Sequence, residues 1–185
     1  QDLFICTRGG GVENQDFNNV FMLNDSAVLI DTPVPLMTDL TNGYYSNAKG
    51  DFNNDGRSDI VITTENTGTI SLFQNTTLNT HNFIKFKLNG RLSNRNGIGS
   101  KYYCYFNGHT RSGYLQCGEN YLSQNSQNIL IGIGEAMYVD SLIIDWPSGV
   151  VDKYYNIERS TFTQLTEAET WGGITFNSSP CIGES

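Results

Sequence analysis

The sequence predicts an all-β protein in which partial propeller-blade-like repeats precede an antiparallel β-sandwich. Three observations support this fold class. Short segments rich in Val, Ile, Phe and Tyr recur along the 185 residues, and Gly- and Asn-rich turns separate them. A weak duplication occupies residues 1–80, and residues 81–167 alternate apolar and polar side chains at the period of half-buried strands. Residues 168–185 form a separate C-terminal tail.

The duplication relates two pairs of expected strands. Residues 2–7 parallel residues 59–64, and each segment is followed by a Gly-containing turn and a second strand, at 20–24 and 70–75. Repetition at a period of about 40–60 residues is typical of propeller blades or a similar array. The first copy lacks the strand and loop that would precede Asp2. Because fewer than two complete copies are present, we do not expect this chain alone to close a propeller.

A nine-residue loop between the copies is the strongest candidate site. Side-chain oxygens stand at its positions 1, 3, 5 and 9, a glycine stands at position 6, and position 7 would add a backbone carbonyl. Hard oxygen ligands at this spacing favour calcium. The expected ligands are Asp51, Asn53, Asp55, Arg57 and Asp59. A polar Asn/Asp/Gly turn without a metal is the alternative, and Ile62 stands where an EF-hand loop has its bidentate glutamate.

The second half contains strand signals at the spacing of a sandwich or barrel. Asn107-Gly108 is a strong hairpin signal between two of the expected strands, and a Gly/Asn-rich loop occupies residues 89–100. The expected strands are residues 82–88, 102–106, 109–117, 129–134, 139–146 and 150–155.

Composition excludes several kinds of partner. Nineteen acidic and eleven basic residues give a net charge of −8, and no basic cluster is present. We therefore expect no nucleic-acid partner. No run of 18 apolar residues occurs, so we expect no transmembrane segment.

Four cysteines without a C-x-x-C pair favour two disulfides over a zinc site. Three connectivities are possible, of which we prefer Cys104–Cys117, with Cys6–Cys181 joining the ends or linking two chains. Three N-x-[ST] sequences make glycosylation acceptors of Asn24, Asn75 and Asn177. Together with a calcium loop, these features indicate an extracellular or cell-surface glycoprotein.

Catalytic constellations are weak in this sequence. Neither His81 nor His109 lies near a serine or cysteine motif that would form a nucleophilic pair, so we predict no catalytic residues. The Ser93–Gly99 loop is compatible with anion binding by backbone N–H groups, or with a turn that only sets strand register. Four tyrosines could form a platform for sugars or could pack on one face of a hairpin: Tyr102, Tyr103, Tyr105 and Tyr114.

Two family resemblances follow from these motifs. The segment G-D-F-N-N-D-G-R-S-D-I-V-I (50–62) resembles the FG-GAP/VCBS repeat of integrin-type propellers, whose blades carry a calcium loop. Three later motifs resemble a UnbV/ASPIC domain of the cartilage acidic protein-like family. They are L-N-G-R-L-S-N-R-N-G-I-G-S (88–100), N-Y-L-S-Q-N-S-Q (120–127) and I-G-I-G-E-A-M-Y-V-D-S-L-I-I-D-W-P-S-G (131–149). The resemblance implies an extracellular, calcium-binding, β-rich module without an established catalytic activity.

The expected function is a non-catalytic structural or adhesive protein that binds Ca²⁺. The incomplete first copy would leave an open strand edge, and the tail segment 171–176 of another copy could add to it, which would give a head-to-tail homo-oligomer or filament. One alternative is a carbohydrate- or protein-binding module of a larger receptor, with a glycan or an extracellular protein as its ligand. The other is a calcium-dependent hydrolase.

Overall fold

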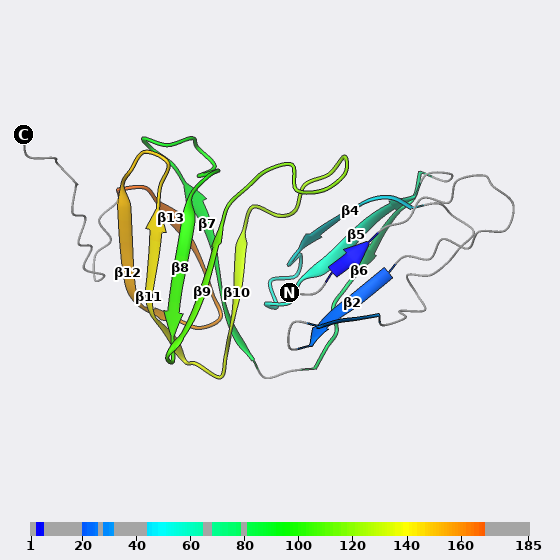
Figure 1. Ribbon diagram of the computed structural model, residues 1–185, viewed down its shortest axis with the longest axis horizontal. Helices are drawn as coiled ribbons and strands as arrows, with labels where there is room; N and C mark the ends of the chain where they lie inside the picture. Colours follow the sequence, from blue (N-terminus) through cyan, green and yellow to red (C-terminus); the bar gives the residue numbers. More distant parts are fainter. Residues whose placement is uncertain are drawn as a thin grey trace, which may run out of the picture. The chain divides into compact units, whose positions relative to one another are not determined.

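The fold was analysed in a computed structural model that describes residues 3–5, 20–25, 28–31, 44–64, 68–78 and 81–168 (Figure 1). These residues form strands and loops and no helix, which confirms the all-β class. The chain divides into two compact units, each built from several segments. Unit 1 comprises residues 1–49, 59–74 and 118–125, and unit 2 comprises residues 50–58, 75–117 and 126–185.

Unit 1 contains two three-stranded sheets. In the first, β2 (Val20–Asp25) lies between β1 (Leu3–Ile5) and β3 (Val28–Asp31). In the second, β5 (Asp59–Thr64) lies between β4 (Tyr44–Gly50) and β6 (Ile70–Phe73). The β1–β2 and β5–β6 pairs are both antiparallel, so the two copies of the duplication have the same pairing direction. The described residues form no closed propeller.

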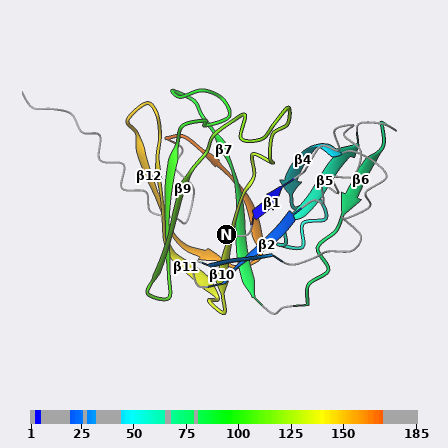
Figure 2. The same cartoon turned by 45° about the vertical axis from the view of Figure 1, so that its right-hand side comes forward.

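Unit 2 is a two-sheet sandwich (Figures 1 and 2). In one sheet, β7 (Asn82–Asn89) lies between β10 (Ile129–Gly134) and β13 (Thr161–Thr166). The other has the order β12 (Val151–Glu158), β11 (Tyr138–Asp145), β8 (Lys101–Phe106), β9 (His109–Tyr114). All pairs are antiparallel except β7 and β13, which run parallel.

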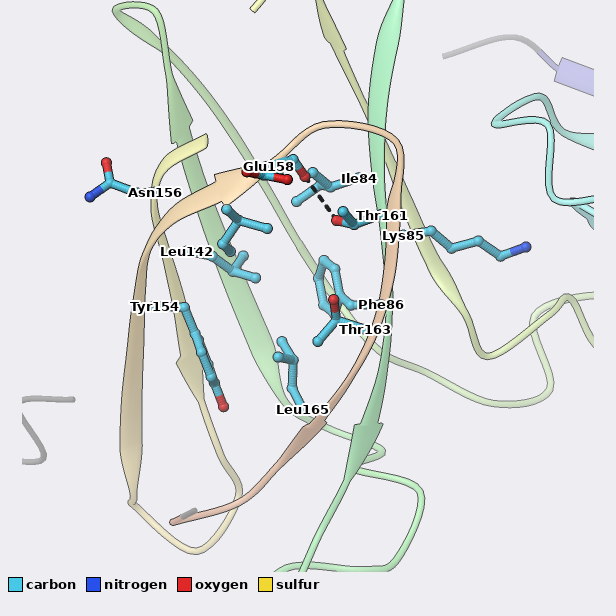
Figure 3. Close-up of a pocket in the computed structure, with 11 residues that line it drawn as sticks. Ile84, Lys85, Phe86, Leu142, Tyr154, Asn156, Glu158, Thr161, Thr163 and Leu165 are labelled. Carbon is cyan, nitrogen blue, oxygen red and sulfur yellow. Dashed lines mark hydrogen bonds between the residues drawn. The ribbon is translucent and has the colours of Figure 1, made fainter. Parts of the chain in front are cut away.

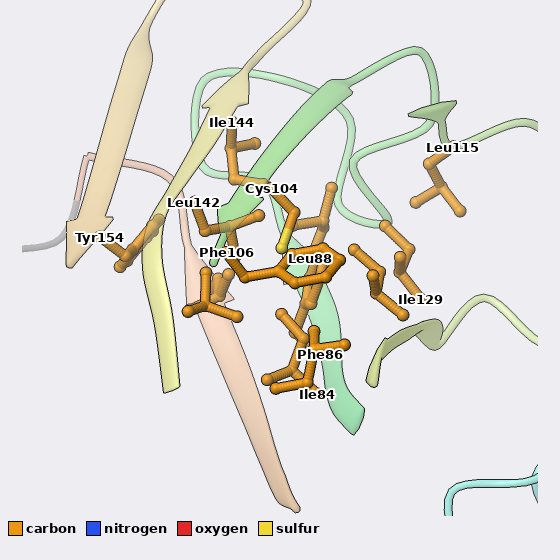
Figure 4. Packing of buried hydrophobic residues seen from close by; sticks show 14 of the residues in the cluster. Ile84, Phe86, Leu88, Cys104, Phe106, Leu115, Ile129, Leu142, Ile144 and Tyr154 are labelled. Carbon is orange, nitrogen blue, oxygen red and sulfur yellow. The ribbon is translucent and has the colours of Figure 1, made fainter. Parts of the chain in front are cut away.

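The sandwich core lies between these two sheets (Figure 4). Alternate residues of β7, β8, β10 and β11 point inward, so one face of each strand is apolar and buried. Trp146, which directly follows β11, is also buried. The core consists mainly of aliphatic side chains with two phenylalanines: Ile84, Phe86, Leu88, Phe106, Ile129, Ile131, Ile133, Val139, Leu142, Ile144 and Leu165.

The hairpin between β8 and β9 forms at the predicted turn. Asn107 and Gly108 both have positive φ, at 46° and 74°, which is the conformation of a type I′ turn. The second strand of the hairpin ends at Tyr114, earlier than the expected residue 117. The expected strands at 82–88, 129–134, 139–146 and 150–155 correspond to β7, β10, β11 and β12.

Two short segments belong to one unit although the residues on both sides of them belong to the other. The loop 50–58 follows β4 but belongs to unit 2, and residues 118–125 leave the sandwich sequence to join unit 1. There, Ser46 Oγ donates to the Tyr121 carbonyl at 2.7 Å, and Lys49 N–H donates to Asn125 Oδ1 at 2.9 Å. Each unit therefore consists of segments from both sides of the division expected near residue 80.

Parts of several predictions lie outside the described residues. These are Cys6, Cys181, Asn177 and the tail from residue 169 onward, including the expected strand donor 171–176. Within the described ranges, no helix is long and apolar enough to cross a membrane.

Candidate functional site

The candidate metal loop begins directly after β4 and reverses the chain tightly. Asn54 and Gly56 adopt positive φ, at 61° and 81°. Asp51 closes the reversal, because its Oδ1 accepts the Asp55 N–H at 3.0 Å and its Oδ2 accepts the Gly56 N–H at 3.2 Å. The sequence pattern of alternating oxygen-bearing residues with a glycine at position 6 therefore forms the expected tight loop.

Gly56 brings the loop against β7. A Cβ atom at this position would lie 2.0 Å from Cδ1 of Phe83, which is far inside van der Waals contact. The positive φ also disfavours any residue with a side chain. Glycine is therefore required here both by the backbone conformation and by the contact with the Phe83 ring.

The middle of the loop holds a second set of polar contacts. Asn53 Oδ1 accepts the Asp55 N–H at 3.1 Å, and Asp55 Oδ1 accepts the Arg57 N–H at 2.9 Å. Arg57 also pairs its Nη2 with Asp55 Oδ2 at 2.6 Å and donates from Nε to the Asn75 carbonyl at 2.9 Å. Partial burial raises the pKa of Asp55, but the hydrogen bonds from Asn53 and Arg57 and the Arg57 charge outweigh it, so the net pKa is lowered.

A lysine from β7 completes the loop. Lys85 Nζ donates to the Asp51 carbonyl at 2.9 Å, to Asp51 Oδ2 at 3.1 Å and to Asn54 Oδ1 at 2.7 Å. The side chains of Lys85 and Asp51 are only 2% and 1% exposed. Lys85 points away from its neighbours Ile84 and Phe86, on the opposite face of β7 (Figure 3). Sequence reasoning missed this residue.

The remaining oxygens fit part of a calcium site. Asp51 Oδ1, Asn53 Oδ1 and Asp55 Oδ1 each accept one backbone N–H, so each keeps a second lone pair for a cation. Asp59 is the first residue of β5, is buried, and belongs to unit 1, whereas the loop belongs to unit 2. No three His, Cys, Asp or Glu side chains in the described ranges are grouped so that they could hold a metal ion. The structure therefore does not assemble the three aspartates as one group.

A second ion site is built into the 89–100 loop. Three successive backbone N–H groups, from Arg91, Leu92 and Ser93, donate to Glu167 Oε2, each at 2.7 Å. Glu167 Oε1 accepts the Ser93 hydroxyl at 2.8 Å and the Ser148 hydroxyl. Converging backbone N–H groups of this kind form an anion-binding nest. The loop thus binds an anion, and that anion is a carboxylate of the same chain.

The Glu167 carboxylate is ionised inside the protein. The residue has no exposed surface. Burial alone raises the pKa of Glu167, but the hydrogen bonds from Ser148, Ser93 and Arg91 outweigh it and lower the pKa to about 2. Strand β13 positions Glu167 because β13 pairs in parallel with β7. The pairing continues one residue beyond β13, where the Glu167 N–H donates to the Asn89 carbonyl at 3.0 Å.

A second buried carboxylate, that of Asp152, lies on β12, the strand that precedes β13 in the chain. Asp152 Oδ2 accepts the Trp146 indole N–H at 2.8 Å and the Ala168 N–H at 3.0 Å. Burial raises the pKa of Asp152, these two hydrogen bonds lower it, the Glu167 charge raises it further, and the net direction is upward. Asp152 therefore holds the end of β13 to the core Trp146, which positions the adjacent Glu167.

Comparison with known protein families agrees with this geometry. A family model described as FG-GAP repeat matches residues 43–73, which are β4, the loop, β5 and β6. A model described as ASPIC and UnbV matches residues 90–171, which cover the sandwich from the nest onward. The chain contains an FG-GAP repeat followed by an ASPIC/UnbV domain. No curated protein matches the chain.

The preferred disulfide of the ASPIC/UnbV domain is wrong. Cys104 and Cys117 are both free thiols. The β8–β9 register places Arg111 opposite Cys104 and Tyr114 opposite Lys101, so Cys117 follows the far end of the β8–β9 pairing and is not the cross-strand partner of Cys104. Cys104 lies in the core (Figure 4), where burial, together with the Asp140 charge, raises its pKa to about 12. The Cys6–Cys181 pairing lies outside the described residues.

The surroundings of the side chain are described for one of the predicted glycosylation acceptors, Asn75. Asn75 is half-buried just after β6, and its Oδ1 accepts the Thr77 N–H at 3.1 Å. Asn24 lies within β2, where only the backbone is described, and it pairs with Leu29 of β3. Of the three, Asn75 is the acceptor whose surroundings are defined, and it lies at the end of a strand as predicted.

The tyrosines of the ASPIC/UnbV domain lie on two faces. Tyr102 points inward and packs edge-on against Phe86, with ring centroids 6.0 Å apart. Tyr103, Tyr105 and Tyr114 lie on the outer face of the four-stranded sheet, because their neighbour Cys104 points into the core and Tyr114 is opposite Lys101. The sequence therefore identified three members of an outer aromatic surface and one core residue.

The described part of the sandwich includes a depression between its sheets and another beside the β8–β9 turn. One, of about 270 Å³, lies between the sheets, is lined mainly by apolar side chains such as Phe86, Leu142 and Tyr154, and ends near the hydrogen bond from Thr161 Oγ1 to the Glu158 carbonyl (Figure 3). The other, of about 450 Å³, is polar and lies beside the β8–β9 turn, where His109 contributes to its lining.

Proposed function

We propose that this chain is a non-catalytic, calcium-binding structural or adhesive protein that functions outside the cell. The observation that carries the proposal is the loop after β4, in which three side-chain oxygens at alternate positions each retain a lone pair. The ion would be held by Asp51, Asn53 and Asp55, with the Arg57 carbonyl at position 7, and Asp59 remains the ligand predicted from sequence at position 9. Calcium would supply a positive charge that brings these oxygens together.

Melting with and without the ion tests the metal assignment. Binding to the folded state alone stabilises it by about 2.7 kcal/mol when free calcium is a hundred times Kd. We expect calcium to raise the melting temperature relative to a chelator, and Asp55→Asn to abolish this gain. Asp145→Asn, which removes a carboxylate from β11 away from the loop, is the matched control. Identical melts of the unmodified chain in calcium and in chelator would refute calcium binding.

Self-assembly extends the structural proposal. β1 is an edge strand of its sheet and pairs only with β2 among the described strands. An unpaired edge is a template for an added strand, and a head-to-tail contact of that kind generates rings or filaments. Sedimentation of the chain at high concentration with calcium should show assemblies, and removal of residues 170–185 should give monomers. A full-length chain that stays monomeric would exclude self-assembly without affecting the calcium proposal.

A glycan-binding module is the second candidate, favoured by the outer tyrosine surface. On this face Tyr105 and Tyr155 share a row through Ser141 of β11, and both are more than a third exposed, at 37% and 39%. Tyr103 lies in the next row and Tyr114, 60% exposed, continues the band onto β9. Tyrosine combines an apolar ring with a hydroxyl, which suits the mixed apolar and polar surface of a sugar.

Binding to immobilised polysaccharides tests this candidate. We expect the combined Tyr105→Ala and Tyr155→Ala change to abolish retention, because it removes the centre of the band. Tyr138→Ala is the control, since Tyr138 is 52% exposed at the start of β11 and is not part of the band. Equal retention of all three proteins would assign any binding to another surface, and no retention of the unmodified chain would exclude the candidate.

A further inference from the structure

The buried ammonium of Lys85 occupies the inner side of the candidate metal loop. It has one acceptor for each of its three protons: the Asp51 carbonyl, Asp51 Oδ2 and Asn54 Oδ1, at 2.7–3.1 Å. The Phe162 ring of β13 lies 5.8 Å from Nζ and is paired in register with Lys85. Lys85 lies on the outer face of β7 together with Lys87, which is exposed, so it is the loop that buries it.

The loop is electrically balanced without any metal ion. Within residues 51–58 the two carboxylates are those of Asp51 and Asp55. Lys85 pairs with the first at 3.1 Å, and Arg57 pairs with the second at 2.6 Å. The Asp51 pair is the more consequential, because it is almost fully buried, whereas the Arg57 pair is partly exposed. Only Lys85 comes from another element, so it also fixes the loop to β7.

We propose that Lys85 is the resident cation of this loop and a competitor of calcium for the charge of Asp51. The ammonium holds Asp51 and Asn54 in the loop conformation when no metal is bound. A divalent ion at Asp51 Oδ1 would then lie on the same carboxylate that Lys85 neutralises from Oδ2, so the two positive charges repel. The calcium half of this inference rests on the proposed function, and the metal-free half does not.

Two consequences distinguish this arrangement from an ordinary metal loop. Without Lys85, the metal-free protein carries an uncompensated buried carboxylate and loses stability. Calcium binds such a protein more tightly, because a unit charge about 5–6 Å from a divalent ion changes its affinity by about tenfold even at the dielectric constant of water, and by more in a less polar medium. Lys85 therefore lowers the affinity of the loop for calcium and stabilises the loop when calcium is absent.

The experiment compares Lys85→Met with Lys87→Met, which removes the exposed lysine two residues along the same face of β7. In chelator, we expect Lys85→Met to melt well below the unmodified chain and Lys87→Met to melt with it. In a calcium titration followed by calorimetry, Lys85→Met should bind about tenfold more tightly than the other two. Its melting temperature should also rise more on addition of calcium.

Each alternative result has a defined meaning. Equal melting of the two variants in chelator would overturn the resident-cation role. If Lys85→Met melts at a lower temperature in chelator but binds calcium no more tightly than the unmodified chain, the competition with calcium is overturned. Absence of calcium binding by all three proteins would refute the proposed function, while the chelator comparison would still decide the role of Lys85.

A second variant covers the case in which Lys85→Met does not fold. Asn54→Gly keeps the positive φ of this position but removes one acceptor of the ammonium. We expect Asn54→Gly to lower the melting temperature of the unmodified chain in chelator. In a chain that already carries Lys85→Arg, Asn54→Gly should lower the melting temperature less, because residues 54 and 85 share one interaction. Strictly additive effects would overturn the proposed contact.

Discussion

Replacing Glu167 by glutamine isolates the contribution of a buried charge to the stability of the ASPIC/UnbV domain. Glutamine has the same shape and keeps one oxygen for the three N–H groups of residues 91–93, while its amide can face the hydroxyls of Ser93 and Ser148. Glu167→Gln therefore removes the negative charge without opening a cavity. The cost of this change measures the charge-assisted part of the nest.

The pKa of Glu167 sets the expected magnitude. Because one pKa unit is worth about 1.4 kcal/mol, the lowering from 4.5 to about 2 is worth about 3 kcal/mol of folding stability. The folded state binds the proton less readily than the unfolded state, so this stabilisation is fully present above about pH 4.5. It is lost as the pH falls from 4.5 toward 2. At pH 7 we expect Glu167→Gln to lower the free energy of unfolding by about 3 kcal/mol, and at pH 3 by about 1 kcal/mol.

Urea unfolding followed by tryptophan fluorescence measures this difference. Trp146 is buried in the sandwich and contacts Asp152, so it reports on this domain. A Trp171→Phe background makes it the sole tryptophan of the chain. Glu135→Gln is the control, because it removes an exposed carboxylate from the same domain. A loss below about 0.5 kcal/mol at pH 7, or an equal loss at pH 3 and pH 7, would refute the reasoning.

Three further predictions follow from local geometry. Gly56→Ala should destabilise the fold by more than about 2 kcal/mol in urea unfolding, whereas Gly108→Ala, which has similar φ but open space around it, should cost about 1 kcal/mol; equal costs would exclude the Phe83 clash. Alkylation followed by mass spectrometry should modify Cys117 quickly in the native protein and Cys104 only after unfolding, and rapid modification of both would contradict the burial of Cys104. Expression through a eukaryotic secretory pathway should add a glycan that Asn75→Gln removes, and an unchanged mass would count against this acceptor.

Local patterns predicted the elements whose stability is local. Strands β7, β10 and β11 bury one face through alternating residues, and Asn107-Gly108 specifies the type I′ turn through its backbone preferences alone. β4 escaped prediction because its sequence, Y-Y-S-N-A-K-G, is mostly polar, and its partners come from residues 59–64. The parallel pairing of β13 with β7 escaped because 77 residues separate Thr166 from Asn89, and no local signal specifies a pairing of that range.

At the loop after β4 and at the nest, sequence patterns likewise predicted the local features and missed the long-range contacts. The backbone of each loop was predicted, because glycine spacing and short polar side chains encode tight turns directly. The charged partner of each loop was missed, because Lys85 lies 34 residues from Asp51 and Glu167 lies 74 residues from Ser93. In sequence, Lys85 is one polar residue of an alternating strand, and Glu167 is one acidic residue after the last strand of the domain.

Both loops therefore carry a motif of ion binding that the chain can satisfy internally. The nest is saturated: its three N–H groups already converge on one carboxylate oxygen, so an external anion would have to displace a buried, fully hydrogen-bonded carboxylate. The loop after β4 differs, because Lys85 and the Gly56 N–H occupy Asp51 Oδ2 while Oδ1 keeps a lone pair for a second cation. Counting lone pairs in this way, rather than matching a motif, makes the nest structural and leaves the loop after β4 with an oxygen for the calcium ion that we propose.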